Sequence, residues 1–319
     1  MAKNASKLYY PMKEAIMSIL PIVDEFVVAL GDCDEDDQTG KEIESIGSDK
    51  IRIIHTKWDI DKYDRGTENA HQTDIAKEHC TGDWLFYLQA DEVIHEKYLD
   101  VIKSACEKFV DDPKVEGFLL KYLHFWADFD HYQYSHSWYK NEIRIVRNDP
   151  EIHSWESAQS FRRIPGFDGK DYRQHIGTHK LRVVKLPVYV YHYGWVRPPH
   201  LMQSKIKSLD TIHRGVEGAD ALNKHRPKVF DYGPLGKASK FADTHPAVMK
   251  DWIDKFNWED KLNYSNDHQI GNENRLILDH ERLKYRIVSF LEQSVFNDSL
   301  CHGICGHALS TCTGGDNRR

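Results

Sequence analysis

The chain has 319 residues, with 43 Lys or Arg against 50 Asp or Glu, which gives a formal net charge of −7. A hydrophobic content of 40% is typical of a protein that forms a core and excludes a chain that is disordered throughout. The negative charge disfavours general electrostatic binding to nucleic acid. No apolar run approaches the roughly 18 to 20 residues of a membrane-spanning helix. We therefore expect a cytoplasmic protein with no nucleic-acid partner and no membrane-spanning segment.

The first half of the chain alternates helical and strand-like periodicity, which predicts an α/β fold with helices on the faces of a sheet. Helical spacing of apolar residues predicts helices over residues 6–20, 69–80 and 98–109. Short apolar runs predict buried strands over residues 26–30, 50–54 and 84–88. Aromatic-rich runs predict that the sheet continues as a mixed sheet over residues 115–122, 142–147 and 182–192.

The second half is more polar and is interrupted by Gly and Pro, which predicts a helix from residue 200 followed by irregular loops to about residue 246. An amphipathic pattern over residues 279–296 predicts a final helix. We therefore divide the chain into a core of residues 1–200, an extension of residues 201–297 and a disordered tail of residues 298–319. The tail contains three of the six cysteines but no paired Cys-x₂-Cys spacing, so structural zinc is disfavoured.

Acidic segments follow two of the predicted strands directly. Asp32 to Asp37 come after the strand at 26–30, and Gln89-Ala90-Asp91-Glu92 come after the strand at 84–88. Ligands of open parallel sheets bind beyond the carboxyl ends of the strands, so these acids stand where chemistry is expected. A carboxylate such as that of Asp91 can bind Mg²⁺ or Mn²⁺. The alternative is that Asp91 and Glu92 cap the helix that follows.

Four short segments occur in a characteristic order. They are Val23-Asp24-Glu25, the run from Phe26 to Leu30 with the acidic loop that ends at Thr39, Cys80-Thr81-Gly82-Asp83, and Leu88-Gln89-Ala90-Asp91-Glu92. Over roughly residues 4–200 this series resembles the family 2 glycosyltransferases of the GT-A fold. The resemblance implies a Rossmann-like mixed sheet with helices on both faces. It also implies an inverting, hexosyltransferase-type enzyme that moves a sugar from a UDP- or GDP-sugar to a hydroxyl of a saccharide or other acceptor, with Mn²⁺ or Mg²⁺.

The resemblance also implies roles for single residues. Asp32 and Asp34 would contact the nucleoside, although each could instead belong to a solvated or helix-capping loop. Asp91 corresponds to the metal-binding aspartate of the family, and His192 would complete the ligand set or else be a hydrogen-bonded core histidine. Gln89 stands where the family has an aspartate, so it would contact the ribose or weaken cation binding.

An inverting transfer needs a general base for the acceptor hydroxyl. Glu156 is the only acid in the segment from His153 to Arg162 that matches the position of the family's base. Trp155 beside it could supply an apolar wall that raises the carboxyl pKa. The alternative is an ordinary surface glutamate near a turn.

An aromatic segment follows His192. Trp195 could stack on a sugar or base and Arg197 could meet a phosphate, or both could be core residues. In the strand predicted at 142–147, Arg144 and Arg147 stand at an odd separation, so they should point to opposite faces of the sheet.

The first strand of the family should precede the helix predicted at 6–20, yet only Met1-Ala2-Lys3 stand before Asn4. We therefore expect the sequence to begin inside the domain and to lack one central strand. This expectation and Gln89 favour a second class of function, in which a GT-A-like protein binds ligands or partners without catalysis. A metal-dependent hydrolase is weaker, because no His-x-Asp or His-Glu-x-x-His motif accompanies the acids.

Overall fold

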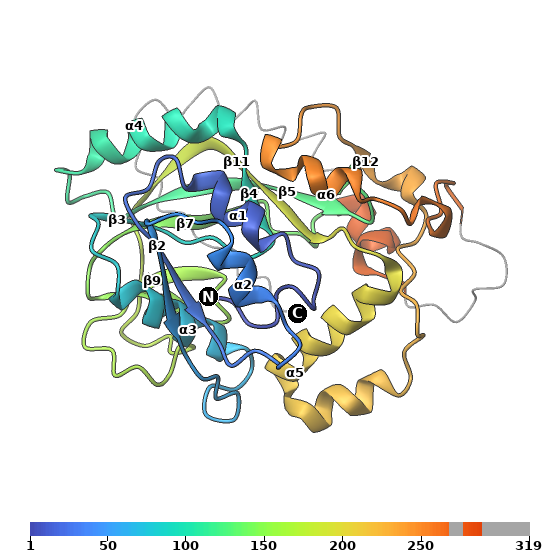
Figure 1. Cartoon of the computed structure of the whole chain (residues 1–319), viewed down its shortest axis with the longest axis horizontal. Coiled ribbons are helices and arrows are strands. Elements are labelled where there is room, and N and C mark those ends of the chain that lie inside the picture. Colours follow the sequence, from blue (N-terminus) through green and yellow to red (C-terminus); the bar gives the residue numbers. More distant parts are fainter. Residues whose placement is uncertain (268–276, 289–319) are drawn as a thin grey trace.

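The structure is a computed structural model that describes residues 1–267 and 277–288 (Figure 1). Its helices include α1 (Met12–Ile19), α2 (Thr39–Glu44), α3 (Thr67–Glu78), α4 (Leu99–Phe109), α5 (Pro199–Asn223) and α6 (Lys250–Asp254). Its strands include β1 (Phe26–Leu30), β2 (Ile51–His55), β3 (Trp84–Phe86), β4 (Glu92–Ile94), β5 (Gly117–Trp126), β6 (His131–Gln133), β7 (Asn141–Arg147), β8 (Ile152–Trp155), β9 (Ser160–Arg163), β10 (His179–Lys180), β11 (Val183–Trp195) and β12 (Ser239–Lys240).

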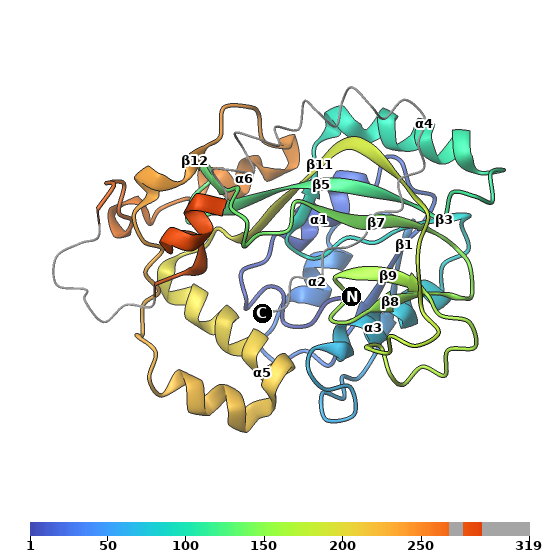
Figure 2. The ribbon, with the colours of Figure 1, turned by 180° about the vertical axis from the view of Figure 1, so that it is seen from behind.

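A seven-stranded mixed sheet forms the centre of the fold. Strand β5 pairs in parallel with β11 and antiparallel with β6 and β7, while β4 pairs antiparallel with β11 and β3 with β7. Strands β8, β9 and β10 form a small antiparallel sheet that lies beside α3, as the view from behind shows (Figure 2). The mixed α/β architecture that the sequence predicts is confirmed, whereas the GT-A connectivity in particular is not shown.

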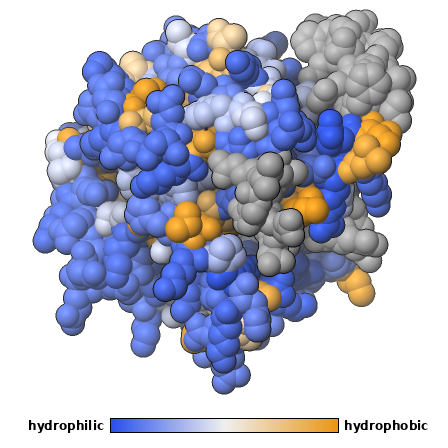
Figure 3. Space-filling model, turned by 90° about the vertical axis from the view of Figure 1, so that its right-hand side faces the viewer, coloured by the Kyte–Doolittle hydropathy of each residue, from blue (hydrophilic) through white to orange (hydrophobic). Residues whose placement is uncertain are grey.

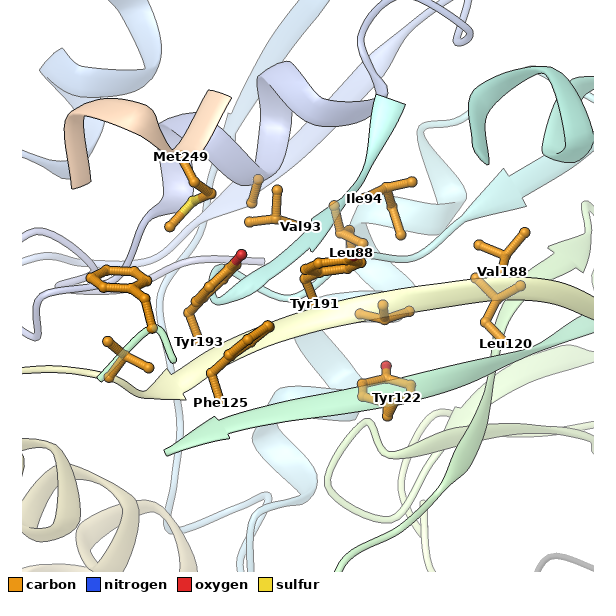
Figure 4. Close-up of a cluster of buried hydrophobic side chains, with 14 of the residues drawn as sticks. Leu88, Val93, Ile94, Leu120, Tyr122, Phe125, Val188, Tyr191, Tyr193 and Met249 are labelled. Atoms are coloured by element: carbon orange, nitrogen blue, oxygen red, sulfur yellow. The ribbon is translucent and has the colours of Figure 1, made fainter. Parts of the chain in front are cut away.

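The main core lies on the face of the large sheet that carries side chains of β4, β5 and β11. Figure 4 shows Phe125, Tyr191 and Tyr193 beside one another, with Val93 and Leu88 above them. The rings of Phe125 and Tyr193 are stacked with centroids 4.8 Å apart. Helix α1 packs on β4 and adds Ala15 and Ile19 to this cluster. The long strands β5 and β11 are therefore held in one rigid unit.

Strands β1 and β2 form a separate parallel pair that shares no strand pairing with β3 among the described residues. Ala2 extends the pair by a single parallel bridge to Leu30. Its N–H donates to the carbonyl of Ala29 (2.9 Å) and its carbonyl accepts from the N–H of Gly31 (2.8 Å). Between the two sheets lies a small hollow whose apolar lining residues include Met12, Ile16, Phe26, Val28 and Leu88.

Two predicted helices differ from the observed ones. Helix α1 begins at Met12 and not at residue 6, because Pro11 lacks an N–H and its ring is incompatible with a helix interior. Residues 6–9 form turns instead. The helix predicted from residue 200 is α5, and it is broken at Gly215, where φ is 73° and ψ is 173°. Only glycine adopts this conformation readily, so the two halves of α5 have different directions.

Within the described ranges, no helix is both long and apolar enough to cross a bilayer. The face in Figure 3 is largely hydrophilic, with apolar side chains in small separate patches. The last predicted helix is described only as far as residue 288, as a 3₁₀ turn at Asp279–Glu281 followed by helical residues. The predicted tail of residues 298–319, with its cysteines, lies outside the described residues.

Gly117 provides a test of how closely β5 and β7 pack. A Cβ at this position would lie 2.5 Å from the carbonyl oxygen of Ile145, which is backbone and cannot move aside cheaply. We expect Gly117→Ala to lower the free energy of unfolding by about 1–3 kcal/mol. At Gly82 the nearest atom would be 3.6 Å away, so Gly82→Ala is the matched control and should leave the unfolding midpoint in guanidinium nearly unchanged. Equal midpoints for the two variants would contradict the close approach.

Candidate functional site

Asp32 and Asp34 lie in the loop beyond the carboxyl end of β1, and both side chains are exposed. Asp32 accepts hydrogen bonds from the Lys3 ammonium (2.7 Å) and the Trp58 N–H (3.1 Å). Burial acts to raise the pKa of Asp32, but these two bonds hold it below its usual value. Asp34 accepts from the Lys7 ammonium (2.8 Å), which lowers its pKa as well. Both aspartates are therefore ionised at neutral pH and stand at an accessible strand end, although no contact tests their predicted role toward a nucleoside.

The turn after β3 is held by Glu92, which is 0% exposed. Its carboxylate accepts two hydrogen bonds from the guanidinium of Arg144 (2.8 and 2.9 Å) and one from the Tyr122 hydroxyl (2.7 Å). It also accepts the N–H of Gln89 (3.1 Å). The predicted alternative of a helix cap is wrong for Asp91 and Glu92, because β4 begins at Glu92 and the side chain of His95 caps the 3₁₀ helix that follows. Glu92 thus fixes the turn that presents Gln89 and Asp91.

The turn that carries Glu156 lies against this first turn. The Gln89 amide donates to the Ala158 carbonyl (3.4 Å), and the Arg144 guanidinium donates to the Gln159 carbonyl (3.0 Å). Glu156 and Ala158 both have positive φ angles, 55° and 59°. Residues other than glycine rarely adopt this left-handed conformation, and such strain persists where the surroundings enforce it. The structure therefore brings Gln89 close to the turn of the predicted base.

Glu142 is a second carboxylate in this neighbourhood, and the sequence analysis did not assign it. Burial raises the pKa of Glu142 to about 7, and the charges of Glu92 and Glu156 act in the same direction, while Arg144 and Arg162 oppose them. A carboxyl group with a pKa near neutrality can exchange a proton at working pH. In a regular strand, residues two apart share a face of the sheet, so the position of Glu142 two residues before Arg144 is the signal that could have identified it.

Asp91 and His192, the predicted metal ligands, lie together at the junction of β3, β4 and β11. The His192 Nε2 atom is 3.5 Å from the Asp91 carboxylate, and the Lys205 ammonium of α5 is 3.7 Å from the same oxygen. Burial would raise the pKa of Asp91, but His192, Lys205 and Arg197 together hold it well below its usual value. Burial and Arg197 lower the pKa of Lys205, and Asp91 opposes them. The sequence analysis missed Lys205, since no local motif marks it.

A buried histidine pair orients the ring of His192. The Nε2 atom of His124 lies 2.8 Å from the Tyr139 carbonyl, which can only accept, so it must carry a proton. Burial lowers the pKa of His124 well below its usual value, and its ring is therefore neutral, with an unprotonated Nδ1. His192 then donates from its own Nδ1 across the 3.0 Å contact to His124. The Nε2 atom of His192 is left facing Asp91.

These side chains do not fit a divalent cation well. Mg²⁺ and Mn²⁺ prefer oxygen ligands and keep several waters or phosphate oxygens in their shell. Asp91 and His192 are each only 6% exposed, and Lys205 already stands beside the carboxylate. Among residues 1–267 and 277–288, no group of three His, Cys, Asp or Glu side chains could hold a metal ion. The predicted Mn²⁺ or Mg²⁺ remains a prediction that this geometry does not favour.

Trp195 and Arg197 lie beside Lys205 and not in an open cleft. Arg197 is fully buried; its guanidinium donates to the Leu8 carbonyl and to the Gly194 carbonyl (3.0 Å). Trp195 is partly buried and its ring centroid lies 5.1 Å from that of Trp126. Both residues therefore pack inside the protein, and their predicted roles toward a substrate stay predictions.

The predicted opposition of the two arginines on β7 agrees with their contacts. Arg144 reaches Glu92, whereas Arg147 donates to the carbonyls of Phe109, Val110 and Asp112 at the end of α4. Only Arg144 therefore belongs to the candidate site.

This chain shows no detectable sequence similarity to known protein families or to curated proteins. The crystal structure of S. aureus TarS 1–349, a glycosyltransferase, aligns at 13% sequence identity with a TM-score of 0.31. The alignment covers 68% of this chain and 66% of TarS 1–349, so the chain spans slightly less than two thirds of that structure. With a TM-score this low, we base no functional conclusion on the likeness.

Removing the charge of Glu92 should be far more damaging than removing a surface charge. In Glu92→Gln the Arg144 guanidinium stays buried without its counter-charge, and we expect a loss of about 3–5 kcal/mol in the free energy of unfolding. The matched control is Glu107→Gln on α4, whose ion pair with Lys103 is long (4.0 Å) and exposed, so stability should not change measurably. Urea unfolding followed by circular dichroism compares the two. A similar small effect in both would disprove the organising role of the pair.

Glu142 should give stability a distinct pH dependence. Its pKa is about 7 in the folded protein against an ordinary value of 4.5, so its contribution is fully present below pH 4.5 and is lost as the pH rises through 7. We therefore expect Glu142→Gln, which cannot ionise, to lose less thermal stability than the wild type between pH 5 and pH 8. Melting temperatures of both proteins across this range measure the difference. Parallel curves would show that Glu142 titrates normally.

Proposed function

We propose that this protein transfers a sugar, with inversion, from a nucleotide-diphosphate donor to an acceptor hydroxyl. The observation that carries the proposal is the contact between two turns: the turn with Gln89 and Asp91 lies against the turn with Glu156. Glu142, whose charge interacts with that of Glu156, is partly buried nearby. The ordered motifs of the sequence support it, because they assign these same turns to donor and acceptor. A UDP- or GDP-sugar is the proposed donor and a saccharide the proposed acceptor.

The chemistry requires one proton transfer and one displacement. The carboxylate of Glu156 accepts the proton of the acceptor hydroxyl while that oxygen forms a bond to the anomeric carbon of the donor. The bond between the anomeric carbon and the diphosphate oxygen breaks, and its electron pair stays on the departing nucleoside diphosphate. Glu142, close enough to interact with Glu156, is the second candidate for this base.

A binding protein without catalysis is the alternative. The burial of Asp91 and Arg197, together with glutamine at position 89, favours this alternative. Such a protein would bind a nucleotide without consuming a donor.

A donor screen with two glutamine variants tests the proposal. The wild type is incubated with UDP- and GDP-sugars and a mixture of acceptors, and mass spectrometry follows transfer product and nucleoside diphosphate. We expect Glu156→Gln to reduce the transfer rate by roughly 10²–10⁴-fold with little change in melting temperature, because only the proton acceptor is lost. Glu107→Gln is the exposed control and should retain full activity.

The outcomes separate the two functions. If nucleotides raise the melting temperature but no donor is consumed, the chain is a binding protein. A wild-type rate in Glu156→Gln with a large loss in Glu142→Gln would transfer the role of base to Glu142. No response to any nucleotide in the folded wild type rejects the proposed function.

A further inference from the structure

Lys205 lies at the one place in the described structure where a metal ion was predicted. It comes from the first half of α5 and is 4% exposed. Its ammonium donates to the Gly194 carbonyl and stands 3.7 Å from the Asp91 carboxylate. The rings of Trp195 and Tyr10 lie 5.0 and 5.4 Å away, so that two aromatic faces also stabilise the positive charge.

The surroundings of Lys205 are those of a bound cation. A carboxylate, a backbone carbonyl and two aromatic faces turn their negative ends toward one point, and His192 closes the remaining side of Asp91. Gly194 is required at this point, since a Cβ there would lie 2.4 Å from the Asp91 carboxylate and 2.7 Å from the His192 Nε2 atom. A divalent ion brought to Asp91 would meet the positive charges of both Lys205 and Arg197.

We propose that Lys205 is a built-in replacement for the divalent cation at Asp91, so that this protein binds nucleoside diphosphates without a metal. Metal-free binding of nucleoside diphosphates, the second clause, rests on the proposed function. The replacement of a cation by Lys205, the first clause, concerns Asp91 and its neighbours alone. When protonated, the side chain of Lys205 supplies a positive charge at the strand end where a metal would otherwise supply it. Neither its position nor its charge depends on the supply of metal ions.

The first experiment uses Mn²⁺ alone and reads the melting temperature. The wild type should melt at the same temperature in Mn²⁺ and in EDTA. Lys205→Gln leaves Asp91 buried without its lysine, so it should melt lower than the wild type in EDTA and recover stability when Mn²⁺ takes the free position. Adding Asp91→Asn to Lys205→Gln should abolish that recovery. Lys207→Gln, which removes an exposed lysine of the same helix, is the matched control and should behave like the wild type.

Two results would overturn the proposal that Lys205 replaces a divalent cation at Asp91. One is a rise in the wild-type melting temperature with Mn²⁺ that Asp91→Asn removes, since the wild type would then hold a metal. The other is a folded Lys205→Gln that ignores Mn²⁺, since Lys205 would then not occupy a cation's position. If Lys205→Gln does not fold, the effect of Mn²⁺ on the melting temperatures of the wild type and of Asp91→Asn still shows whether the wild type holds a metal ion at Asp91.

The second experiment measures the binding of UDP and GDP by calorimetry in EDTA and in Mn²⁺. We expect the same affinity in both within about twofold, which is less than 0.5 kcal/mol of binding free energy. A loss of affinity of tenfold or more in EDTA contradicts metal-free binding. If neither nucleotide binds in either buffer, the proposed function and the second clause of this proposal fail, while the Mn²⁺ experiment still judges the role of Lys205 at Asp91.

Discussion

The buried ion pair of Glu92 and Arg144 is the interaction on which the candidate site depends. It joins β4 to β7, and through the Tyr122 hydroxyl it also joins β5. Burying two charges is costly, and this pair offsets the cost with two parallel hydrogen bonds and with Tyr87 and Tyr122 rings about the guanidinium, 5.3 and 5.2 Å away. The remaining donors of Arg144 hold the turn of Glu156, and Glu92 holds the turn of Gln89. One pair therefore sets the geometry of both turns.

A second charged cluster, around Asp91, lies on the other side of the Gln89–Glu92 turn, and in this cluster the charges are not balanced. Around Asp91 the lysine of α5 and the arginine after β11 outnumber the single carboxylate. The two clusters share a turn of four residues, in which Glu92 serves the structure and Asp91 meets the cations. Adjacent acidic residues in a motif can thus have different structural roles. This explains why the motif alone could not assign separate roles to Asp91 and Glu92.

The sequence predicted the parts of the fold that depend on local pattern. The runs that contain β1 and β3 are continuous and apolar, and an acidic segment follows each of them. Strand β3 ends at Phe86, two residues earlier than predicted, and its residues are only partly buried. Helix α1 is shorter than the apolar spacing predicts, because Pro11 cannot lie inside a helix and α1 begins directly after it. Glu142 had one local signal, its spacing from Arg144, whereas Lys205 could not be placed, because its role arises from contacts between distant segments. A lysine on a helix is ordinarily solvated, and only tertiary packing shows that this one is buried.

The separation of β1 and β2 from the large sheet affects how the two parts of the candidate site are held relative to each other. The aspartates of the first loop belong to one hydrogen-bonded unit and the two turns around Arg144 belong to another. Strands β1 and β3 share no ladder of backbone hydrogen bonds. The two units are joined by apolar contacts across the hollow and by bonds such as those from Thr81 to the Glu25 carboxylate and from Arg52 to the His79 carbonyl. The distance between the loop of Asp32 and Asp34 and the turn of Glu156 therefore depends on the packing of the side chains that line the hollow and not on strand register.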